Sequence, residues 1–154
     1  MTRRRTGFSL IELFIVMIII GLLARLAVPR YHDMKMRAEA SKVLGDVHAG
    51  QLAVSTHHAD TNGWPSNAGA GVVPNELVAY LPQQFSFIKS DYVLELNVTP
   101  PVGGSAIENA IVTIDVTSTD PHLLPVLARI AQPGLGQYPI AGKYTFVLSG
   151  IGSS

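Results

Sequence analysis

The chain contains no cysteine among its 154 residues. It therefore cannot close a disulfide framework, and it cannot build a metal site on thiolate ligands. The absence excludes these two kinds of site but leaves an oxidising compartment open.

Charged residues are also scarce, and neither sign dominates. Lysine and arginine together number 11, aspartate and glutamate number 11, and charged residues make up 14% of the chain. A domain whose main partner is nucleic acid usually carries a marked basic excess. We therefore predict no nucleic-acid partner. The length suits one small domain once an apolar N-terminal segment is set aside.

That apolar segment runs from Phe8 to Val28 and contains only two charged residues, Glu12 and Arg25. At about 1.5 Å per residue, a helix of this length spans roughly 30 Å, the thickness of a bilayer core. The run is too long for the apolar region of a secretory signal, and no small-residue cleavage site follows it. Arginines at positions 3–5 precede it, which predicts a cytoplasmic N-terminus and an exported C-terminal part.

A carboxylate inside an apolar run of membrane length is costly and therefore indicates a functional site. The run opens with the hexapeptide Gly7-Phe8-Ser9-Leu10-Ile11-Glu12, directly after the basic leader. This pattern resembles the N-terminus of the type IV pilin and type II secretion pseudopilin superfamily.

The resemblance extends along the helix. Gly21, Pro29 and Tyr31 lie where members of the superfamily carry a glycine, a proline and often a tyrosine. Arg25 departs from the pattern, because members usually have a small apolar residue at that place. Many pilins also close a C-terminal loop with a disulfide, which this chain cannot do.

The resemblance implies how the chain is processed and assembled. We expect a prepilin peptidase to remove a leader of residues 1–7 by cleaving between Gly7 and Phe8, and to methylate the Phe8 amine. Glu12 is then expected to act in assembly with other pilin or pseudopilin subunits on an inner-membrane assembly platform. The expected location is the bacterial inner membrane, single-pass, with the head periplasmic or in an extracytoplasmic filament.

After residues 8–28, the predicted transmembrane and polymerisation helix, the pattern becomes amphipathic. Pro29 lacks a backbone donor and is expected to kink or loosen the helix. We predict that the helix continues over residues 29–58 and buries one face against a domain. The residues of that face recur at spacings of three and four: Met36, Ala40, Val43, Val47, Gly50 and Val54.

Residues 59–154 are predicted to form a head of loops and an antiparallel sheet. Alternating apolar residues, rich in β-branched and aromatic types, predict three strands. The alternating positions are Leu94, Leu96 and Val98, then Val112, Ile114 and Val116, then Tyr144, Phe146 and Leu148. The fold class is therefore α+β, with a long N-terminal helix packed on a small antiparallel sheet, as in pilins.

Two short helical segments are also expected in the head. One helical turn is predicted between Pro74 and Pro82. A short helix is predicted after Asp120 and Pro121, which suit a cap and a first helical position. Pro125 is expected to make this helix short or irregular, and Pro133 with Gly134 is expected to end it.

No convincing catalytic, cofactor or metal set is visible, and we assign none. His57 and His58 are neighbours on a helix, so their rings diverge, and no further ligand completes a tetrahedral site. Some type II major pseudopilins bind calcium in C-terminal loops, and Ser118, Thr119 and Asp120 are the candidate oxygens here. Helix capping by Asp120 is the competing interpretation, and we favour it.

Two classes of function fit these observations. The first is a structural subunit of a type II secretion pseudopilus or a type IV pilus-like filament. The second is a membrane-tethered enzyme or ligand-binding domain that uses the helix only as an anchor. The leader and Glu12 favour the first class. Binding specificity is expected in the exposed loops Ala59–Val73 and Pro100–Asn109.

Overall fold

The computed structural model describes residues 8–99, 110–131, 136–140 and 142–148. Helix α1 runs from Leu10 to Thr61 and passes through Pro29 without interruption. The chain divides into two compact units, Met1–Lys35 and Met36–Ser154, and α1 contributes residues to both.

Each end of α1 has a local cause. At its start, the backbone N–H of Glu12 donates to the carbonyl of Ser9 at 3.0 Å. At its end, Asn62 has a φ of 51° and donates its N–H to the carbonyl of His58 at 2.8 Å. Asparagine tolerates this left-handed conformation, which commonly ends helices. The helix thus ends at Thr61 and not at the predicted residue 58.

In the second unit, one face of α1 is buried. Its buried residues are Met36, Ala40, Val43, Val47, Gly50, Ala53, Val54 and His57. All six residues of the predicted stripe are therefore confirmed. Ala53 and His57 extend the stripe, because each lies three residues beyond a predicted member.

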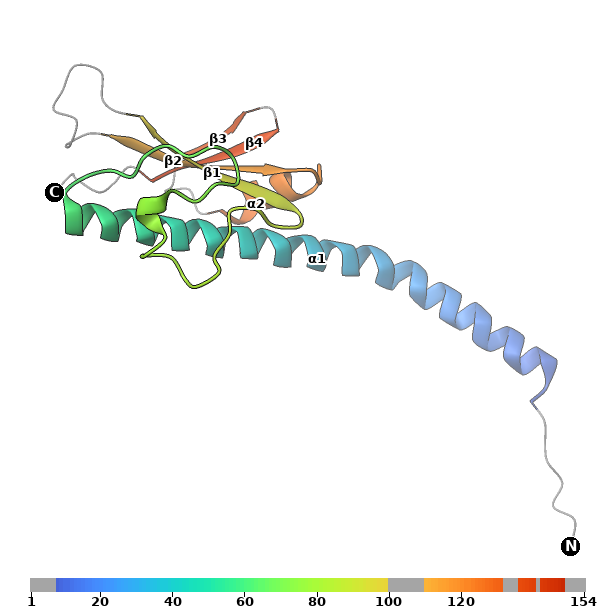
Figure 1. Cartoon of the computed structure of the whole chain (residues 1–154). Helices are drawn as coiled ribbons and strands as arrows, with labels where there is room; N and C mark the ends of the chain where they lie inside the picture. The colour runs from blue at the N-terminus through green and yellow to red at the C-terminus, as the bar shows by residue number, and fades with distance from the viewer. Residues whose placement is uncertain (1–7, 100–109, 132–135, 141, 149–154) are drawn as a thin grey trace, which may run out of the picture. The chain divides into compact units, whose positions relative to one another are not determined.

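The remaining elements form the head shown in Figure 1. They are η1 (Asn75–Leu77), β1 (Tyr92–Thr99), β2 (Ile111–Ser118), α2 (Leu123–Ile130), β3 (Gly136–Ile140) and β4 (Lys143–Val147). The four strands make one antiparallel sheet in the order β1-β2-β4-β3, which lies over the second part of α1. The 3-10 turn η1 confirms the helical turn predicted between prolines.

The buried face of the sheet is the one predicted from the alternation. Leu96 of β1 pairs with Ile114 of β2, which pairs with Phe146 of β4, and all three side chains are fully buried. A second row across the same strands consists of Leu94, Val116 and Tyr144. These rows belong to one hydrophobic core with the buried stripe of α1, which confirms the two-layer α+β head.

Strand β3 corrects the predicted count of three strands. It spans only Gly136–Ile140 and contains Pro139, which lies opposite Tyr144. A proline cannot donate to a sheet ladder and is confined to edge strands. Because β3 pairs with β4 alone, it can tolerate Pro139, whereas the sequence pattern gives no sign of such a strand.

Helix α2 starts later than predicted. The backbone N–H of His122 donates to Asp120 Oδ1 at 2.8 Å, so this carboxylate closes the turn before the helix. Pro121 lies in that turn and not at the first helical position. Pro125 falls in the first turn of α2, where a backbone N–H has no helical acceptor, and the helix therefore stays regular.

Candidate functional site

The described part of the first unit has nothing packed on its surface. Every residue from Phe8 to Lys35 is exposed, including Phe8 at 84% and Ile18 at 56%. Helix α1 is long and apolar enough to cross a membrane. A helix that is apolar on all sides requires lipid or partner helices around it.

Glu12 lies in the first turn of α1. The partial positive charge of a helix N-terminus stabilises a carboxylate there. The spacing from Ser9 to Glu12 is that of a capping box, in which the glutamate side chain turns back to the start of the helix. In the structure, the hydrogen bond between these two residues joins the backbone N–H of Glu12 to the carbonyl of Ser9. Among the described residues, no ion pair involves Glu12.

The other predicted residues of the N-terminal site are Gly7, Phe8 and Pro29, and the structure describes only the last two. Gly7 lies outside the described residues, and Phe8 precedes the first helical residue. Cleavage between them, and methylation of Phe8, stay predictions. Helix α1 includes Pro29, whose missing N–H leaves the carbonyl of Arg25 without its usual helical donor. The predicted kink at Pro29 also stays a prediction.

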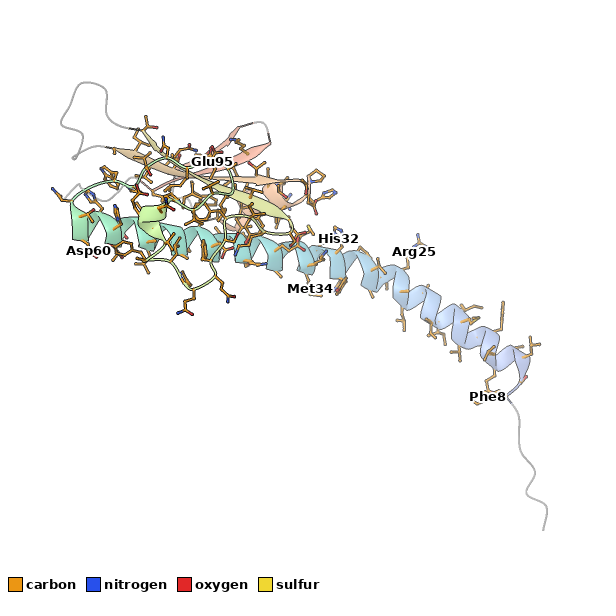
Figure 2. The ribbon with its side chains drawn as sticks, viewed as in Figure 1. Phe8, Arg25, His32, Met34, Asp60 and Glu95 are labelled. Carbon is orange, nitrogen blue, oxygen red and sulfur yellow. The ribbon has the colours of Figure 1, made fainter. Side chains whose placement is uncertain are left out.

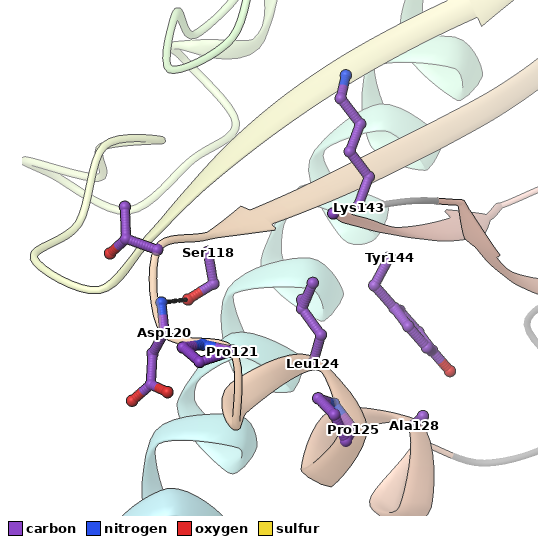
Figure 3. Close-up of a pocket in the computed structure, with 10 residues that line it drawn as sticks. Ser118, Asp120, Pro121, Leu124, Pro125, Ala128, Lys143 and Tyr144 are labelled. Atoms are coloured by element: carbon purple, nitrogen blue, oxygen red, sulfur yellow. Dashed lines mark hydrogen bonds between the residues drawn. The ribbon is translucent and has the colours of Figure 1, made fainter.

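The head contains a pocket of about 510 Å³ beside the turn from β2 to α2 (Figure 3). The Ser118 hydroxyl donates to the Asp91 carbonyl at 2.7 Å and accepts the Asp120 N–H at 3.0 Å. The Asp120 carboxylate accepts the His122 N–H. These oxygens close the turn before α2, whereas the N-cap residue of α2 is His122 and has no side-chain capping bond, so Asp120 is not the helix cap that the sequence suggested. Calcium binding at Ser118, Thr119 and Asp120 stays a prediction.

Lys143 also lines this pocket. Its Nζ lies 3.1 Å from Glu95 Oε2 and 3.9 Å from Asp115 Oδ2. The hydrogen bond to Glu95, followed by the charge of Glu95, raises the pKa of Lys143 above its ordinary value. Burial raises the pKa of the Tyr144 hydroxyl in the same pocket. Both groups are therefore held in their protonated forms at neutral pH, where neither serves as a general base.

The two adjacent histidines point to different partners. The His57 ring meets Tyr80 edge-on with centroids 5.5 Å apart, and the His58 ring stacks on Trp64 at 4.0 Å. Within the part of the chain that the structure describes, no three His, Cys, Asp or Glu side chains cluster as metal ligands do.

One of the two loops predicted to bind partners is used within the head. The Gly71 N–H donates to the Leu94 carbonyl at 2.8 Å, and Asn67 Oδ1 accepts the Val98 N–H. These bonds cover groups of the edge strand β1, which would otherwise be open to a further strand. The loop Pro100–Asn109 lies outside the described residues.

Fold and site define a class of protein: a small α+β head whose first helix continues N-terminally as an uncovered apolar helix with an acidic first turn. Figure 2 shows the side chains of this helix, with Phe8 and Arg25 labelled. Such a helix either anchors the head in a membrane or assembles with other helices.

Comparisons with known proteins narrow the class. The chain is 33% identical to the type IV major pilin protein PilE of Neisseria gonorrhoeae over 78% of its own length and 61% of the pilin. It is 31% identical to the type II secretion system core protein G of Aeromonas hydrophila over 64% of its own length and 68% of that protein. It is 43% identical to the fimbrial protein EcpC of Eikenella corrodens over 43% of its length and 44% of that protein.

The chain therefore belongs to the type IV pilin and type II secretion pseudopilin superfamily. It spans about three fifths of the length of PilE and of one PilE1 pilin of Neisseria gonorrhoeae. No family model matches the chain, and no solved structure matches it.

Proposed function

We propose that this protein is a structural subunit of a type IV pilus-like filament or a type II secretion pseudopilus, assembled through residues 8–28. The observation that carries the proposal is the uncovered apolar helix with Glu12 in its first turn, in a chain of the pilin superfamily. Lipid surrounds this helix before assembly, and neighbouring helices surround it in the filament.

Maturation prepares the site. Cleavage between Gly7 and Phe8 by a prepilin peptidase frees the Phe8 amine, which is then methylated and keeps a positive charge. The three leader arginines hold the N-terminus on the cytoplasmic side, so the head is periplasmic. Mass analysis of the membrane-extracted protein tests this step. An intact leader in cells that contain the peptidase would contradict it.

Glu12 acts between subunits. A carboxylate in an apolar environment needs a compensating charge. The Phe8 amine of a neighbouring subunit supplies it when that neighbour is displaced by about four residues, or roughly 6 Å along the helix. The place of Glu12 in the first turn of α1 supports this role, because its carboxylate lies near the helix N-terminus, where such an amine arrives. The pair neutralises both charges and sets the axial register of the subunits on the assembly platform.

The charge of Glu12 is tested by Glu12→Leu. We expect the Glu12→Leu subunit to insert into the membrane normally but to enter filaments at least about 100-fold less. The neighbour's amine is then left buried without a partner, at about 3–5 kcal/mol. Immunoblots of sheared filaments and membranes measure the two populations. Asp33→Leu is the matched control, since Asp33 is an exposed acid on α1 beyond the apolar run. Wild-type incorporation of Glu12→Leu would disprove this role.

The alternative, a tethered enzyme or binding domain, rests on the pocket beside Lys143. The Tyr144 hydroxyl in this pocket is buried without a hydrogen-bond partner among the described residues, whereas Ser118 bonds to the backbone and Lys143 bonds to Glu95. The engagement of Ser118 and Lys143 favours the filament subunit. Whether the filament is a pilus or a pseudopilus can be tested by deleting the gene and measuring surface filaments and protein secretion separately.

A further inference from the structure

Arg25 is the second charge of the apolar run, and the proposed role of Glu12 leaves it without a function. It is exposed, and the residues three and four positions away on either side are Gly21, Leu22, Val28 and Pro29. None of these can neutralise a cation. Among the described residues, no ion pair involves Arg25.

The need for a partner changes when the subunit leaves the membrane. In a bilayer, Arg25 lies near the end of the apolar run, where its long side chain can reach the headgroups. In a filament, helices replace the lipid, so the headgroups are lost. An arginine keeps its charge in proteins. A buried guanidinium without a counter-charge is strongly destabilising, so packing of the apolar helices requires a carboxylate beside Arg25.

Glu12 of the same chain is too far away to be the carboxylate that pairs with Arg25. Glu12 and Arg25 are 13 residues apart, which is about 20 Å along the helix and about 140° around it. The acid and the cation therefore point to opposite sides of one helix. Two parallel copies displaced by about 20 Å bring the acidic side of one against the Arg25 side of the other. This contact is heterologous, so it repeats in an open series and does not close into a dimer.

Asp33 is the other acid of the first unit, and it is a poorer partner. It lies outside the apolar run and three residues from Arg30, a cation of its own helix. Glu12 lies inside the apolar run, as Arg25 does. A carboxylate has about four acceptor positions, so it can bind an amine from one neighbour and a guanidinium from another.

We propose that Arg25 of one subunit forms an ion pair with Glu12 of a second copy displaced by about 20 Å along the apolar helix. This inference rests on the proposed filament function. It gives each subunit two ionic contacts of different stagger, one through the Phe8 amine and one through Arg25. Two staggers constrain both the rise and the rotation between subunits, which the amine contact alone does not.

The test uses full-length Arg25→Lys, which keeps the charge and adds an amine that a carbodiimide can couple to a carboxylate without a spacer. Isolated filaments are treated with a hydrophobic carbodiimide, and peptides are mapped by mass spectrometry. We expect a cross-link between Lys at position 25 and Glu12 in filaments but not in detergent-dispersed subunits. A cross-link to Asp33, or none to Glu12, would overturn the pairing.

A second measurement covers charge reversal. Arg25→Glu is expected to lower incorporation into filaments roughly tenfold or more, because the new carboxylate at position 25 would face the Glu12 carboxylate of the second copy. The amount of protein in the membrane is expected to stay unchanged. Arg30→Glu, just beyond the apolar run, is the control and is expected to stay within about twofold of the wild type. Equal incorporation of Arg25→Glu, or a loss from the membrane itself, would overturn the pairing in favour of a headgroup contact. If the wild-type chain forms no filaments, the proposed function itself fails.

Discussion

Helix α1 has two parts that differ in almost everything except backbone conformation. Up to Lys35 every described residue is exposed, although most are apolar. From Met36 onwards one stripe is buried and the other faces are polar or partly exposed. The first part therefore lacks the partners that its composition requires, whereas the second part has found them in its own sheet. Under the proposed function, the same secondary structure serves assembly in one part and folding in the other.

This difference follows from how the hydrophobic effect is used. In the head, apolar side chains leave water when the chain folds, and the core of α1, β1, β2 and β4 results. In the first part the apolar side chains stay exposed until lipid or another subunit covers them. Substitutions should thus affect head stability in one part and assembly in the other. Matched pairs of identical residues can test this division.

The largest expected difference is between two isoleucines. Ile114 is fully buried and Ile18 is 56% exposed. We expect Ile114→Ala to lower the free energy of unfolding of the head by about 2–5 kcal/mol, because it opens a cavity in the core. Ile18→Ala should change it by less than about 0.5 kcal/mol. Denaturant unfolding of the detergent-solubilised chain, followed by fluorescence of Trp64, the only tryptophan, measures both. Equal changes in the free energy of unfolding for the two variants would contradict the difference between the two parts of α1.

A smaller difference is expected between two tyrosines. The Tyr92 hydroxyl donates to Asp46 Oδ2 at 2.5 Å, and Lys89 Nζ lies 3.2 Å from the same oxygen. Tyr92→Phe should lower the free energy of unfolding by about 1.5–3 kcal/mol, the range for hydrogen bonds to charged groups. The Tyr31 side chain on α1 is 69% exposed, so Tyr31→Phe should hardly change the free energy of unfolding. The same unfolding measurement distinguishes them.

Tyr92 also predicts how the head responds to alkaline pH. Burial, and then the hydrogen bond to Asp46, raises the pKa of Tyr92 above its ordinary value of 10.0. The folded state therefore holds this proton more tightly than the unfolded state. Its contribution is complete below about pH 10 and is lost as the pH rises above that value. In Tyr92→Phe the decline of stability above pH 10 should be shallower, and an unchanged decline would rule out this origin.

The smallest expected effect separates two glycines of α1. A Cβ on Gly50 would lie 2.8 Å from Ile114 Cδ1, whereas a Cβ on Gly45 meets nothing within 4 Å. Gly50→Ala should destabilise the head by about 1 kcal/mol, because overpacking outweighs the gain in helix propensity. Gly45→Ala should stabilise it by about 0.5–1 kcal/mol. Changes of opposite sign in the free energy of unfolding would support the distinction between the two positions. A stabilising Gly50→Ala would show that Ile114 can move aside.

Several features of the fold and site could be predicted from the sequence because they depend on local patterns. The stripe that begins at Met36 follows from helical spacing, and the buried rows through Ile114 follow from alternation. Glu12 could be singled out because a carboxylate in an apolar run is rare, whereas Gly7 and Phe8 were implied by the resemblance to the pilin and pseudopilin superfamily. The end of α1 was misjudged because Asn62 sets it through a left-handed conformation.

The sequence by itself determined which segments are apolar, with what period, and where the charges lie, because these are properties of the order of residues along a helix or strand. Only the tertiary structure decided that Gly136–Ile140 forms an edge strand despite Pro139, that Asp120 closes the turn before α2, and that Asn67 covers the edge of β1. Each of these depends on a partner distant in sequence or on one particular turn, and hydrogen bonds across such gaps leave no periodic trace in the chain.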